Sequence, residues 1–187
     1  MNRQQAMTQL GDTLGVSPLP TSIAGFVETL GGTRGVAILM GADPGNKRAV
    51  SSAQRTVQRY LLGERGDTSK QARGTTPKAH SRMVGNLQDA LARREKAAAQ
   101  RRRPDGFSAR VRGDFFKSHS QKGRAVKPVQ IDAAGMESII DNIQAGDYEG
   151  AASAFDDAYG ASYDVPGMSW GEPGSVDDDA FDSLEID

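Results

Sequence analysis

Residues 52–63 read SAQRTVQRYLLG, and this stretch carries the clearest fold signal in the chain. Val57, Tyr60 and Leu61 fall at positions i, i+3 and i+4, so they share one face of a helix that we expect over residues 53–62. The opposite face is polar and cationic. It carries two glutamines and two arginines: Gln54, Arg55, Gln58 and Arg59.

Two shorter apolar patterns precede this helix. Residues 22–30 place apolar side chains on one helical face, and residues 33–40 repeat the pattern after Gly31-Gly32. Three short helices of which the last is polar and cationic are typical of a helix-turn-helix. An ordinary helical bundle with an amphipathic third helix is the alternative interpretation.

The polar face of the third helix has side chains that suit DNA. A helix fits the major groove, where arginine donates to guanine and glutamine pairs with adenine. Ser51 or Ser52 is the expected N-cap, and a phosphate beside Ser52 would lie at the positive end of the helix. We therefore expect this module to contact DNA through seven residues: Lys47, Arg48, Ser52, Gln54, Arg55, Gln58 and Arg59.

The net charge of −1 hides a strong separation of charge along the 187 residues. Residues 47–127 contain 21 Lys and Arg against six acids, whereas residues 128–187 contain 15 acids and no Lys or Arg. This division is typical of a nucleic-acid-binding middle followed by an acidic end. A solvated surface with blocks of charge is the alternative.

A long basic helix and a hairpin are expected in the cationic region. Met83, Leu87 and Leu91 recur every four residues within a predicted helix over residues 78–103. Residues 107–115 alternate as a half-buried strand with Ser108 on its open face, and residues 124–131 are the expected returning strand. The end of the helix and the strand add five candidate phosphate contacts: Arg101, Arg102, Arg103, Arg110 and Arg112.

The acidic region begins with two short predicted helices, over residues 133–145 and 147–159. From residue 160 onward the chain is rich in Gly, Ser and Asp, and it ends in DDDAFDSLEID. Acids interleaved with apolar residues favour a disordered partner-binding tail. A solubilising tail, or a tail that folds back on the basic middle and competes with DNA, are the alternatives.

Composition argues against several classes of protein. The chain has no cysteine and two histidines, and 37% of its residues are hydrophobic. It has no phosphate-binding Walker loop, no metal-ligand spacing, no apolar run long enough for a membrane and no export signal. We therefore expect no cofactor, no metal, no membrane partner and no autonomous enzyme, but a cytoplasmic, nucleoid-associated protein.

The run SAQRTVQRYLLG resembles a segment of the terminal proteins that cap the linear chromosomes and plasmids of actinobacteria. The order of parts over residues 20–125 is similar too, including the Arg-rich strand near residues 108–112. Residues 41–50 depart from the tight turn that usually joins the second and third helices of that family.

This resemblance implies a protein that binds telomeric DNA and carries the first nucleotide on a hydroxyl side chain, from which a DNA polymerase extends. The linking residue is expected beyond the basic helix, and Thr76 is the last threonine, so the role would fall to a serine. The candidates are Ser108, Ser118 and Ser120. A polymerase and a telomere-associated protein are the partners implied for the acidic carboxyl end.

Together these observations predict a mainly α protein with a small β-hairpin. Its expected parts are a flexible segment (1–20), a helix-turn-helix-like DNA-binding module (21–77), a basic helix and β-hairpin (78–131), an acidic helical pair (132–163) and an acidic disordered tail (164–187). The expected function is that of a replication-priming terminal protein. The alternatives are a helix-turn-helix transcriptional regulator of operator-like DNA and a DNA binder without sequence choice.

Overall fold

The structure is a computed structural model that describes residues 1–66, 75–117, 120–125, 128–162, 168–170 and 181–187. Seven helices and five strands lie within these ranges, so a mainly helical fold with a small antiparallel sheet is confirmed. The chain forms two compact units. We call Leu19–Arg94 the helical unit, and Met1–Pro18 with Glu95–Asp187 the sheet unit.

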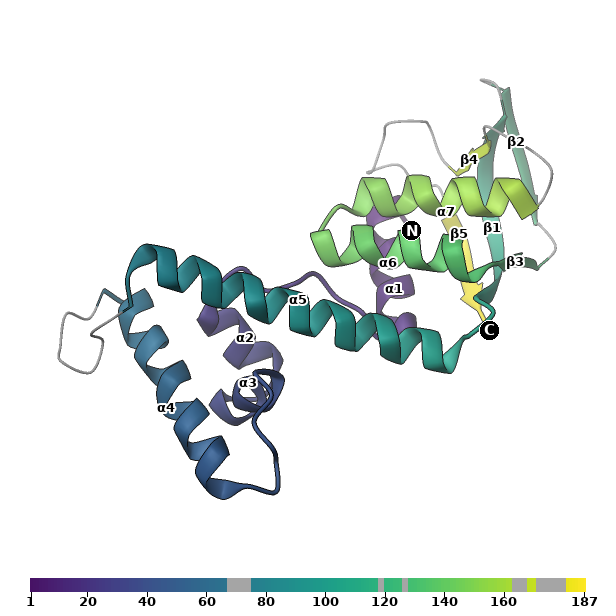
Figure 1. Cartoon of the computed structure of the whole chain (residues 1–187). Helices are drawn as coiled ribbons and strands as arrows, with labels where there is room; N and C mark the ends of the chain where they lie inside the picture. The colour runs from purple at the N-terminus through teal and green to yellow at the C-terminus, as the bar shows by residue number, and fades with distance from the viewer. Residues whose placement is uncertain (67–74, 118–119, 126–127, 163–167, 171–180) are drawn as a thin grey trace. The chain divides into compact units, whose positions relative to one another are not determined.

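The helical unit contains α2 (Ile23–Thr29), α3 (Thr33–Leu39), α4 (Lys47–Glu64) and the first part of α5 (Pro77–Arg102) (Figure 1). All four helices contribute to one apolar core. Full burial of a large apolar side chain stabilises a fold by about 1.5–3 kcal/mol, so this cluster holds the unit together: Ile23, Phe26, Val36, Val57, Met83, Val84, Leu87 and Leu91.

A carboxylate joins the end of α4 to the start of α2. The Glu64 side chain accepts hydrogen bonds from the backbone N–H groups of Ile23 (3.0 Å) and Ala24 (2.9 Å). Its Oε1 also lies 3.1 Å from Nε2 of His80 on α5. A negative group at a helix N-terminus satisfies free N–H donors and complements the helix dipole. Glu64 therefore fixes α4 within the helical unit.

The sheet unit begins with a well-packed helix in a segment that the sequence predicted to be flexible. Residues 1–20 were expected to be flexible, but α1 (Arg3–Leu14) starts at a capping box formed by Asn2 and Gln5. Its apolar side chains fall on one face and are buried: Ala6, Met7, Leu10 and Leu14. The Arg3 guanidinium lies 2.8 Å from a carboxylate oxygen of Asp156, and both side chains are buried. The expectation of a flexible segment is therefore wrong over α1.

The sheet is built around one long strand, β1 (Phe107–Lys117). Along one edge of β1 lie β2 (Ser120–Ala125) and β3 (Val129–Ile131), and along the other lie β4 (Met168–Trp170) and β5 (Phe181–Ile186). All pairings are antiparallel. The predicted hairpin is present, but its returning strand, expected over residues 124–131, begins at Ser120 as β2, and residues 129–131 form the separate strand β3.

Alternation along β1 separates a core face from an open face. Phe107, Ala109 and Val111 are buried, whereas Arg110 and Arg112 are exposed. Gly106 precedes the strand at φ +89°, and a Cβ there would lie 1.9 Å from the carbonyl oxygen of Ile131. Only glycine fits this close approach of two backbones. The predicted orientation of β1 is confirmed.

Two helices and α1 cover the core face of the sheet. The predicted acidic helical pair is present as α6 (Ala133–Ala145) and α7 (Tyr148–Ser162), which lie side by side (Figure 1). The N-cap of α6 is Asp132, whose carboxylate accepts from the N–H of Gly135 at 2.8 Å. Apolar side chains of both helices join the core of the sheet unit: Met136, Ile139, Ile140, Ile143, Ala151, Ala152, Phe155 and Tyr159.

The end of the acidic tail is a strand. Residues 164–187 were expected to be disordered, but β5 pairs with β1 from Ala109 to Gly113 and buries Leu184 to 3% exposure. The expectation is therefore wrong over residues 181–186, because alternating apolar side chains give this segment a face that the core can bury. Residues 171–180 lie outside the described part of the chain.

Candidate nucleic-acid interface

Helix α4 begins earlier than its apolar pattern indicates. Asn46 is the N-cap, and its side-chain oxygen accepts from the backbone N–H groups of Arg48 and Ala49, each at 3.1 Å. The expected cap at Ser51 or Ser52 is therefore wrong, and Ser52 lies within the helix rather than at its positive end. The sequence could have indicated this cap, because asparagine is among the strongest N-cap residues.

The inner face of α4 fixes the orientation of the helix. Val50 and Val57 lie two turns apart and are buried, while Tyr60 and Leu61 pack against the core of the helical unit. A residue spacing of seven places side chains on the same face of a helix. The side chains on the opposite face must consequently point outward.

That outward face carries a continuous row of polar and cationic side chains, which we call the α4 stripe: Arg48, Ser52, Arg55, Gln58 and Arg59. All five residues are exposed, as is Lys47 in the first turn. Arg48, Arg55 and Arg59 are spaced seven and four residues apart, so their guanidinium groups follow one side of the helix. The sequence-predicted DNA contacts on α4 are thus brought together, with one exception.

The exception is Gln54. It is half-buried, and its side-chain nitrogen donates to the hydroxyl of Thr33 on α3 at 3.2 Å. This hydrogen bond ties the start of α3 to α4. In this structure Gln54 is therefore occupied within the helical unit.

The cations of the α4 stripe have no acidic partner in the described part of the chain. No carboxylate there forms an ion pair with Arg48, Arg55 or Arg59. An open hollow of about 430 Å³ on this face is lined by residues that include Arg55, Gln58, Arg59 and Leu62. The stripe is therefore a charged surface free to meet an anion.

Two of the three arginines at the end of α5, unlike those of the α4 stripe, donate hydrogen bonds within the sheet unit. Arg102 donates from Nη2 to the carbonyl oxygen of Leu14 at 2.6 Å and so caps the end of α1. Arg103 donates from Nη1 to the carbonyl oxygen of Asp187. Arg101 is exposed in the last turn of α5. Two of these three candidate phosphate contacts therefore hold the sheet unit together.

The open face of β1 is partly neutralised by the acidic end of the chain. Nη1 of Arg110 lies 3.7 Å from a carboxylate oxygen of Glu185 on the neighbouring β5. Arg112 is exposed and lies opposite Ser183 of β5 in the register. Among the described residues of the helical unit, no carboxylate pairs with an α4 cation, so the two predicted basic surfaces differ.

The three candidate linking serines lie in different parts of the chain. Ser108 is half-buried on β1, and its backbone exchanges two hydrogen bonds with that of Asp187, at 3.4 and 3.0 Å. Ser118 lies outside the described residues. Ser120 is the first residue of β2 and is paired in register with Lys117. Ser120 thus lies at the start of the strand that pairs with β1, and it follows Ser118 by two positions in the sequence.

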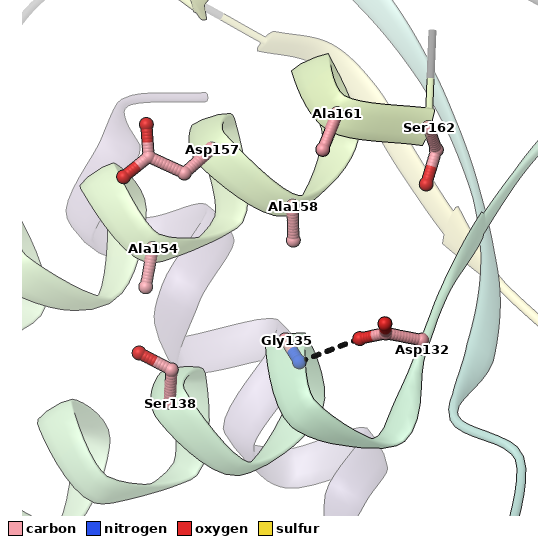
Figure 2. Close-up of a pocket in the computed structure, with 8 residues that line it drawn as sticks. All are labelled: Asp132, Gly135, Ser138, Ala154, Asp157, Ala158, Ala161 and Ser162. Atoms are coloured by element: carbon pink, nitrogen blue, oxygen red, sulfur yellow. Dashed lines mark hydrogen bonds between the residues drawn. The ribbon is translucent and has the colours of Figure 1, made fainter. Parts of the chain in front are cut away.

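A hollow of about 460 Å³ between α6 and α7 has the opposite character (Figure 2). Small side chains and Gly135 leave the space open, and the charged residues that line it in the described part of the chain are Asp132 and Asp157. A Cβ at Gly135 would lie 2.8 Å from that of Ala158, so the two helices approach closely here. Two carboxylates repel a phosphate backbone, and this hollow therefore does not suit nucleic acid.

Lys96 shows how the acidic helices engage the cations of α5. Its Nζ lies 2.6 Å from Glu137 and 2.8 Å from Asp141 on α6. Burial lowers the pKa of Lys96, but the hydrogen bonds and charges of Asp141 and Glu137 outweigh burial and raise that pKa above its ordinary 10.5. Lys96 therefore remains charged and acts as a tie between α5 and α6.

Two further properties of the described residues bear on function. No group of three or more His, Asp and Glu side chains there could hold a metal ion. None of the described helices is both long and apolar enough to cross a membrane.

Comparisons with known proteins identify no relative. No protein-family model, curated protein sequence or solved structure matches this chain.

Proposed function

We propose that the chain is a DNA-binding protein that places α4 in the major groove. The observation that supports this proposal is the α4 stripe, a row of exposed cationic and amide side chains with no acidic partner in the described part of the chain. Phosphate neutralisation by Lys and Arg supplies most non-specific affinity for DNA. An unpaired cationic helix face offers that energy without first breaking ion pairs.

The side chains of the stripe suit base reading as well as phosphate contact. Arg55 and Arg59 carry guanidinium groups that can donate twice to guanine, and Gln58 can pair with adenine. Lys47 and Arg48 lie in the first turn of α4, where the positive end of the helix dipole favours a phosphate. We assign base contacts to Arg55, Gln58 and Arg59, and phosphate contacts to Lys47 and Arg48.

Helices α2, α3 and α4 would then form the helix-turn-helix module. The connection between α3 and α4 runs from Met40 to Asn46, longer than the three or four residues of a typical helix-turn-helix turn. The core on α2, α3 and α5 holds α4 without a tight turn. A longer connection therefore still allows α4 to present its stripe.

The first test is DNA retardation by paired substitutions. The double variant Arg55→Ala/Arg59→Ala should bind duplex DNA at least tenfold more weakly than the unmodified protein, since each good base contact contributes about 1–3 kcal/mol. Arg93→Ala/Arg94→Ala removes the same charge from exposed positions on α5 of the same unit and is the matched control. Equal losses in both variants would contradict the assignment of α4 as the DNA-reading helix.

The biological role we propose is capping of the ends of a linear replicon and priming of its replication. It is supported by the resemblance of residues 52–63 to actinobacterial terminal proteins and by the serines that border the β1–β2 connection. In the priming step, a serine oxygen attacks the α-phosphorus of a deoxynucleoside triphosphate. Pyrophosphate leaves, and the polymerase supplies the metal ions that assist proton loss.

The priming role has a direct chemical test. Incubation with a cognate polymerase, Mg²⁺ and a labelled deoxynucleoside triphosphate should label the protein covalently. Ser118→Ala/Ser120→Ala should abolish the label if the connection carries the acceptor, whereas Ser108→Ala should abolish it if β1 does. Labelling that survives replacement of all three serines would contradict these candidates.

A transcriptional regulator is the second candidate function. It is favoured by the placement of Ser108, whose backbone is fixed between strands, because a linking hydroxyl must reach a polymerase. A regulator should bind one palindromic duplex far more tightly than random DNA of equal length, and it should acquire no covalent nucleotide. Binding that prefers DNA ends over internal sites would favour the terminal protein.

A further inference from the structure

The last residues of the chain pair with a cationic segment of the sheet. Residues 181–187 carry three acids and no Lys or Arg, while residues 107–112 of β1 carry two arginines and no acid. The two segments are paired in register, with Glu185 opposite Arg110. Opposite charges are thus aligned along β1 and β5.

Several contacts hold β5 in this position. Leu184 is buried in the core of the sheet unit, and its carbonyl oxygen accepts from Nε2 of Gln9 at 3.0 Å. The backbone of Asp187 exchanges hydrogen bonds with that of Ser108, and its carbonyl oxygen accepts from Arg103. These contacts do not involve the Glu185 side chain, which is 61% exposed. The acidic side chain is therefore presented to solvent beside the arginines by a strand that is fixed elsewhere.

We propose that β5 is an internal competitor that weakens the binding of nucleic-acid phosphates to the open face of β1. The proposal rests on the proposed DNA-binding function and adds a second, self-screened anion surface formed by Arg110 and Arg112. A carboxylate beside a guanidinium lowers the local positive potential and repels an approaching phosphate. The α4 stripe belongs to the helical unit and is not part of this pairing.

The difference between the two surfaces sets the order in which DNA binds them. A phosphate that binds the α4 stripe displaces no acidic side chain of the described chain, whereas one that binds Arg110 must compete with Glu185. DNA should consequently bind through α4 first. The open face of β1 contributes more when Glu185 is neutralised or moved away.

The test changes one charge at a time on β5. Glu185→Gln keeps the shape of the side chain and removes its charge, and Glu185→Lys reverses it. Asp157→Asn and Asp157→Lys make the same charge changes at an exposed position of α7 and serve as matched controls. Because both sites are exposed, the fold should survive, and circular dichroism checks this.

We expect Glu185→Gln to tighten duplex DNA binding in dilute buffer by about two- to fivefold, since an exposed ion pair of this kind has a modest energy. Glu185→Lys should tighten DNA binding further. It should also steepen the fall of affinity with salt concentration by the amount expected for about one additional phosphate contact. The Asp157 variants should change affinity less than their Glu185 counterparts. Equal effects at Glu185 and Asp157, or none at Glu185, would overturn the proposal.

The same substitutions in an Arg55→Ala/Arg59→Ala background separate this inference from the proposed function. If the α4 double variant binds as tightly as its parent while Glu185→Gln still tightens binding, α4 is not the DNA-reading helix but the screening by β5 stands. If the α4 variant loses binding and Glu185→Gln changes nothing, the proposed function stands and the screening is overturned. If no variant retards DNA, both are overturned.

Discussion

The α4 stripe and the arginines of the sheet unit have similar compositions and different surroundings. On α4, Arg48, Arg55 and Arg59 are exposed and unpaired within the described part of the chain. In the sheet unit, Arg102 caps α1 and Arg110 faces Glu185. The comparison shows that a count of cations does not locate a nucleic-acid surface, because a cation that already has an anionic or carbonyl partner offers less to a phosphate.

In the part of the chain that the structure describes, the acidic region supplies carboxylates to ion pairs of the sheet unit and to none of the helical unit. It supplies ion-pair partners for cations of the sheet unit, namely Asp156 for Arg3, Glu137 and Asp141 for Lys96, and Glu185 for Arg110. The helical unit contains no part of the acidic region. Among the described residues, none of these carboxylates of the acidic region pairs with an α4 cation.

The largest effect should follow from breaking the buried pair of the sheet unit. Arg3→Ala removes the guanidinium that lies 2.8 Å from the buried carboxylate of Asp156, and removal of one member of a buried pair costs about 3–5 kcal/mol. Denaturant unfolding followed by fluorescence of Trp170, the only tryptophan and part of β4, reports on this unit. Arg48→Ala, at an exposed position of α4, should leave that transition unchanged. A loss below about 1 kcal/mol would show that the pair is not essential to the fold.

A smaller effect should distinguish the two surfaces in DNA binding. Arg55→Ala should weaken binding to the preferred duplex by about 1–3 kcal/mol, whereas Arg110→Ala should weaken it by less than about 0.5 kcal/mol because Glu185 already faces that guanidinium. Titration of labelled duplex at fixed salt measures both. An Arg110 effect equal to that of Arg55 would remove the distinction between the free and the screened arginines.

Next in size is the hydrogen bond that closes α1. Arg102→Ala removes the donor to the carbonyl oxygen of Leu14 and should lower the free energy of unfolding of the sheet unit by about 1 kcal/mol. Arg101→Ala, at the exposed neighbouring position, is the matched control and should cost much less. If both substitutions changed DNA affinity and neither changed stability, Arg102 would belong with the α4 arginines as a binding residue.

The smallest effect concerns Lys96 and alkaline pH. Because the pKa of Lys96 is raised in the fold, its pairing with Glu137 and Asp141 stabilises the protein fully below the unfolded pKa of 10.5 and is lost as pH rises through the higher folded value. Both carboxylates are well exposed, so the contribution should be about 0.2–1 kcal/mol. Lys96→Met should reduce the loss of stability measured between pH 10 and pH 12. An unchanged alkaline slope would contradict this role.

Local patterns predicted most of the elements. The alternation of Phe107, Ala109 and Val111 predicted β1 and its core face, and the apolar spacing of α6 and α7 predicted both helices. Two predictions were wrong, and both concern polar segments whose structure depends on contacts with distant parts of the chain. Helix α1 carries five buried apolar or small side chains on an otherwise polar segment, and Phe181–Ile186 forms a strand only because β1 offers it an edge.

The sequence also predicts some features of the candidate nucleic-acid interface and not others. The composition of the α4 stripe is readable from the sequence, because a helical period fixes which side chains share a face. Its freedom from acidic partners is not readable, since Glu185 and Arg110 are 75 positions apart and yet adjacent in the sheet. The α4 cap was readable at Asn46 but was obscured by the apolar pattern that begins later.

The sequence by itself determined the helical periods, the orientation of β1 and the segregation of positive from negative charge. All of these depend on the repeat of the backbone or on residue identity, and both are local properties. Only the tertiary structure decided which cations are paired and that the carboxyl end is a strand. Ion pairs and strand pairing join positions far apart in the chain, so their energies exist only after the core has brought those positions together.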